Sequence, residues 1–401
     1  MSGRRTLGHN RGMDDDRDRV LAFPRAPDAI ELRHLRSFVA VAEELNFGRA
    51  AEQLYLSQPA LSRQIRALEQ FVGVELLRRS THRVELTLAG EALLDRARSI
   101  LREVDQAVSV TQSVGGELVG RSVGMWKALA DLADAGADVH ALRDAYEALH
   151  AQFSPPPEVT VRPASAGGVS SLLVAPPDQP TTSILYLHGG GYMLGSAFGY
   201  RHLAGALALA ADAGALVPDY RLAPEHPFPA AVDDALSAYR WLLDRGQEPD
   251  RILVAGDSSG GGLVLSVLLS LKRDGLPQPA GGLLFCPFVE LTRSAKARPS
   301  AEAYLAAHPA DDPLVSPLTA DLGGLPPLLI QVATGDEWAE GGQALAARAR
   351  EHGVDARLEL YPVATHVFHL FWSFLPEATE ALQSAGRFAS EVRGTAIRAT
   401  G

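Results

Sequence analysis

Apolar residues recur at helical spacing near the start of the chain. The first stripe comprises Leu35, Phe38, Val39, Ala42 and Leu45. Two further stripes follow at 50–54 and 61–68, and the breaks between the three stripes, at 46–48 and 56–58, are only a few residues long. Apolar side chains three and four positions apart share one face of an α-helix. The pattern therefore predicts three short helices in succession, as in a helix-turn-helix unit.

A small wing and a long helix are predicted next. Residues 75–77 and 84–87 alternate in polarity on either side of a basic turn, as in a two-stranded hairpin. From Gly90 onward, apolar residues recur in alternating steps of four and three, at Leu93, Ala97, Ile100, Val104, Ala107, Thr111 and Val114. This heptad seam favours a helix that pairs with a second copy, so we expect a homo-oligomer through it. The alternative is a helix packed on its own domain.

The rest of the chain alternates between helical and β-rich patterns. Gly115, Gly116 and Gly120 indicate a hinge, and two helical stretches follow it at 126–132 and 139–153. Short β-rich runs then alternate with helical ones, at 159–161, 172–175, 184–187, 215–217, 252–255, 283–285, 328–332 and 357–361. Such alternation predicts an α/β domain with a mainly parallel sheet.

Length and composition fit a folded chain of more than one domain. The 401 residues exceed a usual single core, and 46% apolar with 21% charged residues is the balance of a folded protein. The single cysteine, Cys286, lies in an apolar run, so we expect it to pack in the core. No signal sequence follows Arg4 and Arg5, and no apolar stretch of about 18 residues occurs. We therefore expect a cytoplasmic protein without a membrane partner.

The net charge of −11 argues at first against a nucleic-acid partner, because the phosphate backbone attracts positive charge. However, residues 57–83 contain five arginines against two acidic residues, so the acidity belongs to the later domain. The third predicted helix, with Ser57 as its N-cap, presents near its start Gln58, Pro59, Ser62, Arg63 and Arg66. A recognition helix meets base edges and phosphates there, although an ordinary solvated helix carries the same residue types.

A serine flanked by glycines follows the β-rich run at 252–255. The turn into the next helical stretch consists of Gly256, Asp257, Ser258, Ser259 and Gly260. Glycines are needed in such a strand–turn–helix because the turn is too tight for side chains, and the helix N-terminus favours developing negative charge. We expect Ser258 to be a nucleophile; the alternative is a simple helix cap.

A second turn is suited to an oxyanion hole. The β-rich run at 184–187 ends in His188, Gly189, Gly190 and Gly191. The bare backbone N–H groups of this turn can point at a carbonyl oxygen, together with the N–H of Ser259. A glycine-rich turn also suits phosphate, but the spacing fits neither a dinucleotide fingerprint nor a P-loop. We expect neither a cofactor nor a metal.

A base and an acid are expected after later strands. His366 follows the run at 357–361, and Asp336 and Glu337 follow the run at 328–332. A nucleophile, an acid and a histidine in this order match a Ser/His/Asp arrangement, in which the acid fixes the tautomer of the histidine. The alternative is a set of ordinary loop histidines, including His188, and turn residues.

Residues 32–94 resemble the winged helix-turn-helix domain of LysR-type transcriptional regulators, most specifically in the motif SQPALSRQIRALE. The resemblance implies a double-stranded DNA partner, whose major groove would receive Gln58, Pro59, Ser62 and Arg63. It places Arg83 of the wing near the minor groove and implies phosphate contacts from Arg49, Arg78 or Arg79. The effector domain usual in that family has no counterpart in this chain.

Residues 126–392 resemble the hormone-sensitive-lipase group of esterases, an α/β-hydrolase family with a helical cap. Four ordered motifs carry the resemblance: HGGGY, DYRLAPEHPFPAA at 219–231, GDSSGG and THVFHLF. In that group the acid precedes the histidine by about thirty residues, which implies a triad of Ser258, Asp336 and His366. The chain departs from the group at Ser259, where Ala is usual, and in a shorter stretch between Leu291 and Pro317.

These patterns predict a multidomain chain, an α-rich winged helix-turn-helix followed by an α/β-hydrolase fold. We expect a disordered tail at 1–29, the winged domain at 30–90, a linker helix and hinge at 91–124, and the hydrolase domain at 125–401 with a cap at 125–154. The expected function is a DNA-binding regulator that senses or hydrolyses a small carboxylic ester. The alternatives are a plain carboxylesterase with a DNA tether and a receptor that binds without turnover.

Overall fold

Two compact units make up the chain, Met1–Val108 and Ser109–Gly401. The computed structural model describes residues 30–79, 84–114, 116–178, 180–291 and 298–399. The predicted tail and Arg83 of the wing lie outside these residues, as does the side chain of Arg79. Across the described part of the chain, no helix is long and apolar enough to cross a membrane.

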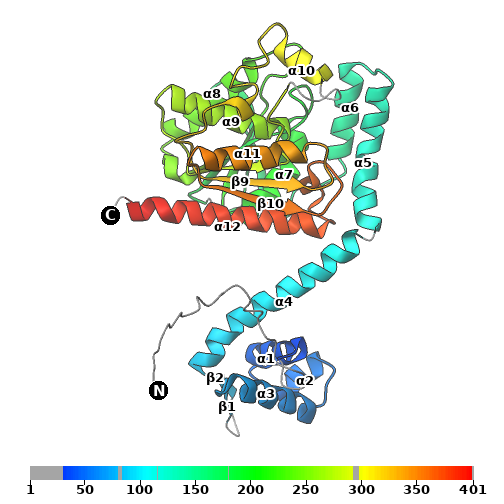
Figure 1. Cartoon of the computed structure of the whole chain (residues 1–401), viewed down its shortest axis with the longest axis vertical. Coiled ribbons are helices and arrows are strands. Elements are labelled where there is room, and N and C mark those ends of the chain that lie inside the picture. Colours follow the sequence, from blue (N-terminus) through cyan, green and yellow to red (C-terminus); the bar gives the residue numbers. More distant parts are fainter. Residues whose placement is uncertain (1–29, 80–83, 115, 179, 292–297, 400–401) are drawn as a thin grey trace, which may run out of the picture. The chain divides into compact units, whose positions relative to one another are not determined.

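The N-terminal unit is a winged helix-turn-helix (Figure 1). Its elements are α1 (Leu32–Glu44), α2 (Phe47–Gln53), α3 (Gln58–Val72), β1 (Leu77–Arg79), β2 (Val84–Leu86) and the first part of α4 (Leu88–Val114). The predicted apolar stripes meet in one core, in which Phe38, Leu61 and Ile65 are fully buried. Ser57 occupies the N-cap of α3 but its side chain makes no cap hydrogen bond.

The heptad seam of α4 is used differently along its length. Leu93 and Ala97 pack into the winged-helix core, and Ala97 is fully buried there. These two positions follow the alternative of a helix packed on its own domain. Ile100 is 41% exposed, and the side chains of 105–114 lie outside the described residues. The homo-oligomer therefore stays a prediction, and it depends on the second half of the seam.

The C-terminal unit is an α/β-hydrolase fold built on a mixed sheet. Its strands are β3 (Thr160–Ala166), β4 (Val169–Ala175), β5 (Ser183–Leu187), β6 (Gly214–Pro218), β7 (Ile252–Asp257), β8 (Gly281–Phe285), β9 (Leu328–Ala333) and β10 (Ala356–Tyr361). The strand order is β10-β9-β8-β7-β5-β6-β4-β3. Only the pairs β3–β4 and β4–β6 of this sheet are antiparallel. The mainly parallel sheet predicted from the sequence is confirmed.

Helices cover both faces of this sheet (Figure 1). One apolar cluster contains α8 (Ala230–Asp244), α9 (Ser259–Arg273) and α11 (Ala339–Glu351), and the other contains α6 (Val139–His150), α7 (Ala197–Ala210) and α12 (Pro376–Ala399). Within β7, Val254 belongs to the first cluster and Leu253 to the second, because successive strand side chains point to opposite faces. The other helical elements are α5 (Glu117–Asp134), α10 (Arg298–Leu305), η1 (Pro249–Arg251), η2 (Pro317–Thr319) and η3 (Phe368–Phe371).

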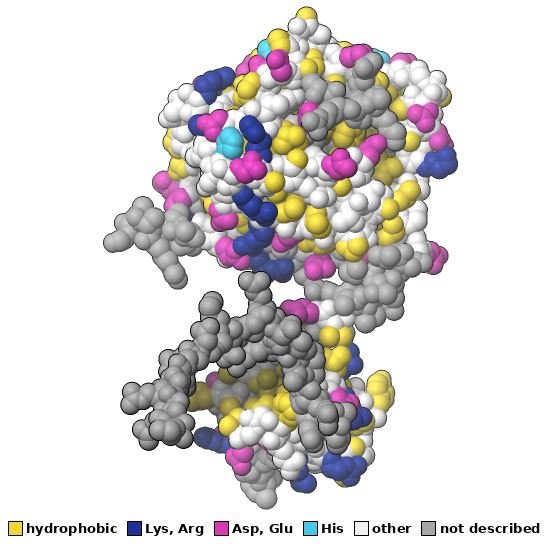
Figure 2. Space-filling view, in the orientation of Figure 1, with side chains coloured by type: hydrophobic (Ala, Val, Ile, Leu, Met, Phe, Trp, Pro, Cys, Tyr) yellow, Lys and Arg dark blue, Asp and Glu magenta, His cyan; other side chains and the backbone are white. Residues whose placement is uncertain are grey.

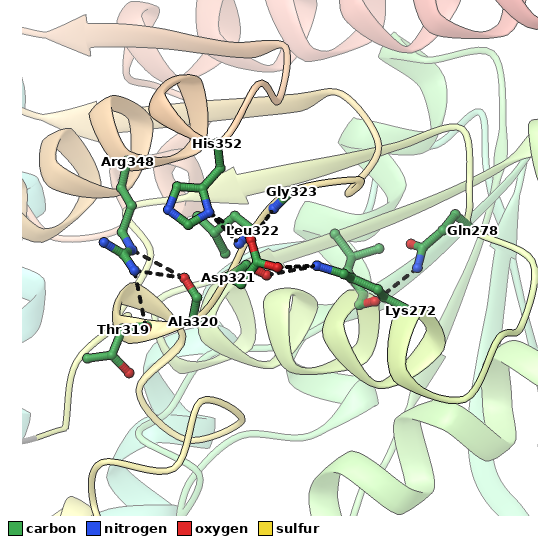
Figure 3. Close-up of polar contacts among 10 residues, drawn as sticks. Lys272, Gln278, Thr319, Ala320, Asp321, Leu322, Gly323, Arg348 and His352 are labelled. Atoms are coloured by element: carbon green, nitrogen blue, oxygen red, sulfur yellow. Dashed lines mark hydrogen bonds and ion pairs between the residues drawn. The ribbon is translucent and has the colours of Figure 1, made fainter.

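Polar contacts tie the segment before β9 to two helices (Figure 3). Lys272 of α9 donates to Asp321 Oδ2 over 3.0 Å, and His352 Nδ1 lies 2.9 Å from Asp321 Oδ1. Arg348 of α11 donates to the backbone oxygen of Ala320. The hydrogen bond from Lys272 contributes most to holding the pKa of Asp321 well below its usual value. The entry into β9 is thereby fixed to α9 and α11.

Charge is divided unequally between the two units. Residues 1–108 carry 17 Lys and Arg against 16 Asp and Glu, whereas residues 109–401 carry 20 against 32. Figure 2 shows acidic side chains scattered over the visible face of the hydrolase unit. The acidity of the chain thus belongs to the hydrolase unit, and the winged-helix unit is close to neutral.

Candidate functional site

Ser258 lies on a tight turn between β7 and α9. Its backbone has φ 50° and ψ −121°, a conformation that non-glycine residues rarely adopt. A Cβ at Gly256 would lie 2.5 Å from the Gly260 oxygen, and a Cβ at Gly260 would lie 2.0 Å from the Leu187 oxygen. Both of these contacts are too short for any side chain, so the turn requires glycine at both positions.

Ser258, His366 and Asp336 form one hydrogen-bonded line. His366 Nε2 lies 2.8 Å from Ser258 Oγ, and His366 Nδ1 lies 2.6 Å from Asp336 Oδ2. Of the two acidic residues expected here, Asp336 is therefore the one that contacts His366. The side chain of Asp336 is 1% exposed and that of His366 is 24% exposed. A neutral imidazole held by a carboxylate at Nδ1 presents its Nε2 lone pair to the serine hydroxyl.

Cys286 lies beside this line of side chains. Its sulfur and one atom each of Asp336 and His366 lie within 4.8 Å of one another, a spacing that a metal ion could use. However, burial above all, and the charge of Asp336 next, raise the pKa of the Cys286 thiol far above its usual value. A metal ligand has to be a thiolate, and Nδ1 of His366 already faces Asp336. The contacts of Cys286, Asp336 and His366 therefore fit a hydrogen-bonded Ser/His/Asp arrangement beside a buried thiol better than they fit a metal site.

The glycine turn after β5 lies next to the serine turn. A Cβ at Gly190 would lie 2.2 Å from the Leu194 oxygen, and Gly191 has φ 63°. Among the described hydrogen bonds, none engages the N–H of Gly190 or Gly191. Ser259 Oγ accepts a hydrogen bond from Tyr192 N over 3.3 Å, which joins the two turns. The serine at the position where alanine is usual therefore has a contact of its own.

Asp257, which precedes Ser258, anchors the glycine turn from below. Its Oδ1 accepts from Gly189 N over 3.0 Å and from the Tyr186 hydroxyl over 2.8 Å, and its Oδ2 accepts from the Tyr200 hydroxyl over 2.9 Å. Burial raises the pKa of Asp257 to about 6, and the hydrogen bonds from the two tyrosines and Gly189 oppose that rise. The N–H of Gly189 is thus used for structure.

His188 also supports the turn. Its Nδ1 lies 2.8 Å from the Gly189 oxygen, and its ring stacks on Tyr220 with 4.3 Å between the centroids. Burial lowers the pKa of His188 to about 4, so the imidazole is neutral near pH 7. The Tyr220 hydroxyl donates to the His188 oxygen over 2.6 Å. His188 packs behind the turn and fixes its backbone.

The residues expected to read DNA gather on α3. Gln58, Pro59 and Arg63 are exposed, Ser62 is half-buried, and all four belong to the N-terminal half of the helix. Of the residues expected at phosphates, Arg78 of β1 is exposed, and Arg49 of α2 is exposed and pairs with Glu44 over 2.7 Å. The helix thus presents a polar and basic edge outside its apolar core.

Comparison with known proteins shows which families this chain resembles. A family model described as alpha/beta hydrolase fold matches residues 184–370, and one described as bacterial regulatory helix-turn-helix protein, lysR family, matches residues 32–91. An acetyl-hydrolase of Streptomyces hygroscopicus is 38% identical over 65% of this chain and 93% of that protein. An esterase of Acinetobacter venetianus is 33% identical over 63% of this chain and 89% of that protein.

Solved structures agree with these relatives. An esterase from the bacterial hormone-sensitive lipase family aligns with a TM-score of 0.65 at 34% identity, over 69% of this chain and 98% of that chain. The chain belongs to the hormone-sensitive-lipase family of esterases. Its N-terminal unit adds a helix-turn-helix domain of the LysR family. Both resemblances found in the sequence, and the two fold classes they imply, are confirmed.

Three side chains of the hormone-sensitive-lipase domain support the site and were missed by sequence reasoning. Tyr186 and Tyr200 hold Asp257, and the Trp126 indole N–H donates to the backbone oxygen of His366 over 3.1 Å. Tyr186 precedes the glycine turn within an apolar strand, which is a sequence signal of burial. Trp126 and His366 are 240 residues apart, and no local pattern indicates their contact.

Proposed function

We propose that this protein is a DNA-binding regulator whose hormone-sensitive-lipase domain hydrolyses a small carboxylic ester through Ser258, His366 and Asp336. The observation that carries the proposal is the pair of short contacts on either side of the His366 ring, 2.8 Å to Ser258 and 2.6 Å to Asp336. Three side chains from separate loops seldom adopt this arrangement unless the histidine moves protons for the serine.

The chemistry follows from these contacts. As Ser258 Oγ bonds to the ester carbonyl carbon, its proton passes to His366 Nε2, and buried Asp336 stabilises the imidazolium. The tetrahedral intermediate collapses when the alcohol leaves with that proton, and an acyl-serine remains. Water then repeats the sequence: His366 takes its proton, the acid is released, and Ser258 regains its hydrogen.

The developing oxyanion needs donors that are fixed in advance. We assign this role to the N–H groups of Gly190, Gly191 and Ser259, because the Gly189 N–H is bound to Asp257. Ser259 is the first residue of α9, so its N–H is one of the free donors at the start of a helix. Removal of one such donor costs about 100- to 1000-fold in kcat in other serine hydrolases.

The winged helix supplies the second half of the proposal. We assign base contacts to Gln58, Pro59, Ser62 and Arg63, and phosphate contacts to Arg49, Arg78 or Arg79. Arg83 of the wing would approach the minor groove. Arg63→Ala is then expected to lose about 1–3 kcal/mol of discrimination between a selected duplex and random DNA, whereas Arg78→Ala weakens both alike. Equal losses for both duplexes in Arg63→Ala would mean that Arg63 only positions the protein.

The two halves are joined by α4 and α5, with no other effector domain between them. We propose that occupancy of the ester site changes the path of the chain at 115–124, and so changes DNA affinity. Only a ligand that favours one of two states of this segment can produce such an effect. A plain esterase with a DNA tether is the outcome if no effect exists.

The test of the hydrolase is Ser258→Ala with p-nitrophenyl butyrate as the probe ester. We expect kcat to fall by up to about a millionfold, while DNA binding stays unchanged as a control for folding. Turnover equal to that of the unsubstituted protein would remove Ser258 from the mechanism. An unsubstituted protein that binds esters and never hydrolyses them would be the receptor of the alternative reading.

A further inference from the structure

Helix α5 contacts the loop that carries His366. The indole N–H of Trp126 donates to the backbone oxygen of His366 over 3.1 Å, and the two rings lie 6.5 Å apart at 49°. The Trp126 ring also lies 6.0 Å from Tyr146 and meets the edge of Phe371 at 6.5 Å. The indole therefore bridges α5, α6 and the segment that follows the histidine.

The His366 loop needs such support. Val367, the next residue, has φ 45°, a left-handed conformation that is uncommon for a β-branched side chain. A strained backbone persists only where its surroundings hold it. Among the described residues, Trp126 is the donor to the His366 carbonyl. The side chain of His366 has to contact Ser258 and Asp336 at the same time, so a small shift of its backbone would lengthen one or both of these hydrogen bonds.

Helix α5 packs on the hydrolase core through apolar side chains that stay partly exposed: Leu118, Val119, Met125, Trp126 and Leu129. In this helix of 18 residues only Ser122 is buried, and its hydroxyl bonds within the helix, to the Val119 oxygen. Beyond Trp126, the guanidinium of Arg121 lies 4.2 Å from the centre of the Phe374 ring. An element whose apolar side chains stay partly exposed opens at a lower free energy than the sheet and its fully buried helices.

We infer that Trp126 is a positioning residue for His366, and that α5 has to be docked for the esterase to turn over. The inference rests on the proposed function, because it assigns a task to Trp126 only if His366 is the base. Helix α4, which begins in the winged-helix unit, ends at Val114, and α5 begins at Glu117. The segment on which turnover depends is therefore the first one after the DNA-binding part.

The test uses the full chain with Trp126→Phe, which keeps an aromatic ring and removes the N–H donor. Trp241→Phe on α8 is the matched control, because Trp241 is also half-buried and its ring contacts Arg245, which is not a triad residue. We expect kcat for p-nitrophenyl butyrate to fall about tenfold in Trp126→Phe, with KM nearly unchanged. A misplaced base slows the chemical step and leaves ester binding intact.

A second variant and a melting temperature separate positioning from folding. Arg121→Ala frees α5 from Phe374 without touching the triad, and we expect it to lower kcat in the same direction at an equal Tm. If Trp126→Phe and Arg121→Ala both keep kcat within about twofold of Trp241→Phe, the inference is wrong. If the unsubstituted protein hydrolyses no ester, the proposed function fails instead, so the two failures are distinguishable.

Discussion

The buried carboxylate of Asp257 stabilises the glycine turn beside Ser258. It accepts hydrogen bonds from Gly189, Tyr186 and Tyr200, and so fixes the start of the glycine turn. In Asp257→Asn, an NH₂ group replaces one of the two carboxylate oxygens, so one buried donor loses its acceptor. A buried donor without an acceptor costs about 1–3 kcal/mol of folding free energy. We expect kcat for p-nitrophenyl butyrate to fall roughly 10- to 100-fold, because the turn also carries the proposed oxyanion donors. Steady-state kinetics beside the exposed control Asp178→Asn test this, and equal kcat values would contradict it.

Residues close in sequence were easier to predict than residues that meet only in the fold. Ser258 and its flanking glycines are recognisable in the sequence because the tight turn tolerates no side chain. The spacing between acid and histidine in the family favours Asp336 over Glu337. The contacts of Trp126 with His366 and of Tyr200 with Asp257 join distant segments. No period or motif encodes such pairings, since they depend on tertiary packing. Ser259 was predicted as a backbone donor, and the contact of its hydroxyl with Tyr192 was not.

At the scale of elements, Arg143 of α6 fastens the helical segment to the loops beside the site. Its guanidinium donates to the backbone oxygens of Met193 and Ala223 and pairs with Glu225 over 2.7 Å. Arg143→Ala leaves these carbonyls without their donor, so we expect the hydrolase unit to lose about 1–3 kcal/mol of unfolding free energy. Denaturant unfolding measures this loss.

The control for Arg143 is Arg273→Ala. Arg273 forms an exposed ion pair with Asp274, and pairs of this kind contribute about 0–1 kcal/mol. A stability change in Arg143→Ala no larger than in Arg273→Ala would mean that α6 is held mainly by its apolar face. In that case the hydrogen bonds of Arg143 would contribute little to the stability of the hydrolase unit.

The helix-turn-helix was predictable because its apolar residues recur at helical spacing, and the strands were predictable because they are short, β-rich and bounded by turns. Every β-rich run became a strand, since buried parallel strands read as short apolar runs. The long helix α4 shows where a period is not enough. Leu93 and Ala97 satisfy the heptad rule, yet they pack into their own domain. A heptad seam records which face is apolar and not what covers it.

At the scale of the whole molecule, buried histidines set the response to acid. Burial lowers the pKa of His188 to about 4, of His202 to about 3 and of His369 to about 3, and it also lowers that of His150. Between about pH 6.5 and 4 the unfolded chain therefore binds more protons than the folded chain, so the unfolding free energy falls as the pH falls. Burial raises the pKa of Asp257 to about 6 and also raises the pKa values of Glu147 and Glu380, and these three groups oppose the trend.

We accordingly expect the melting temperature of the hydrolase unit to decrease from pH 7 to pH 4.5. Differential scanning calorimetry of the full chain across this range measures it. His202→Gln removes one of the titrating groups and should flatten the slope. A melting temperature that stays level or rises on acidification would show that these histidines are not neutral in the folded protein.

We propose that ester binding and DNA binding are linked in this chain, and a titration in both directions measures the linkage. We expect Ser258→Ala to bind p-nitrophenyl butyrate without turnover, and its affinity for a duplex selected from a random-sequence pool can be measured by fluorescence anisotropy. We expect saturating ester to change duplex affinity by about 5- to 150-fold, and saturating duplex to change ester affinity by the same factor, because linkage is reciprocal. Equal duplex affinity with the ester site empty and saturated would mean that the two sites are not linked and that the esterase is merely tethered to DNA.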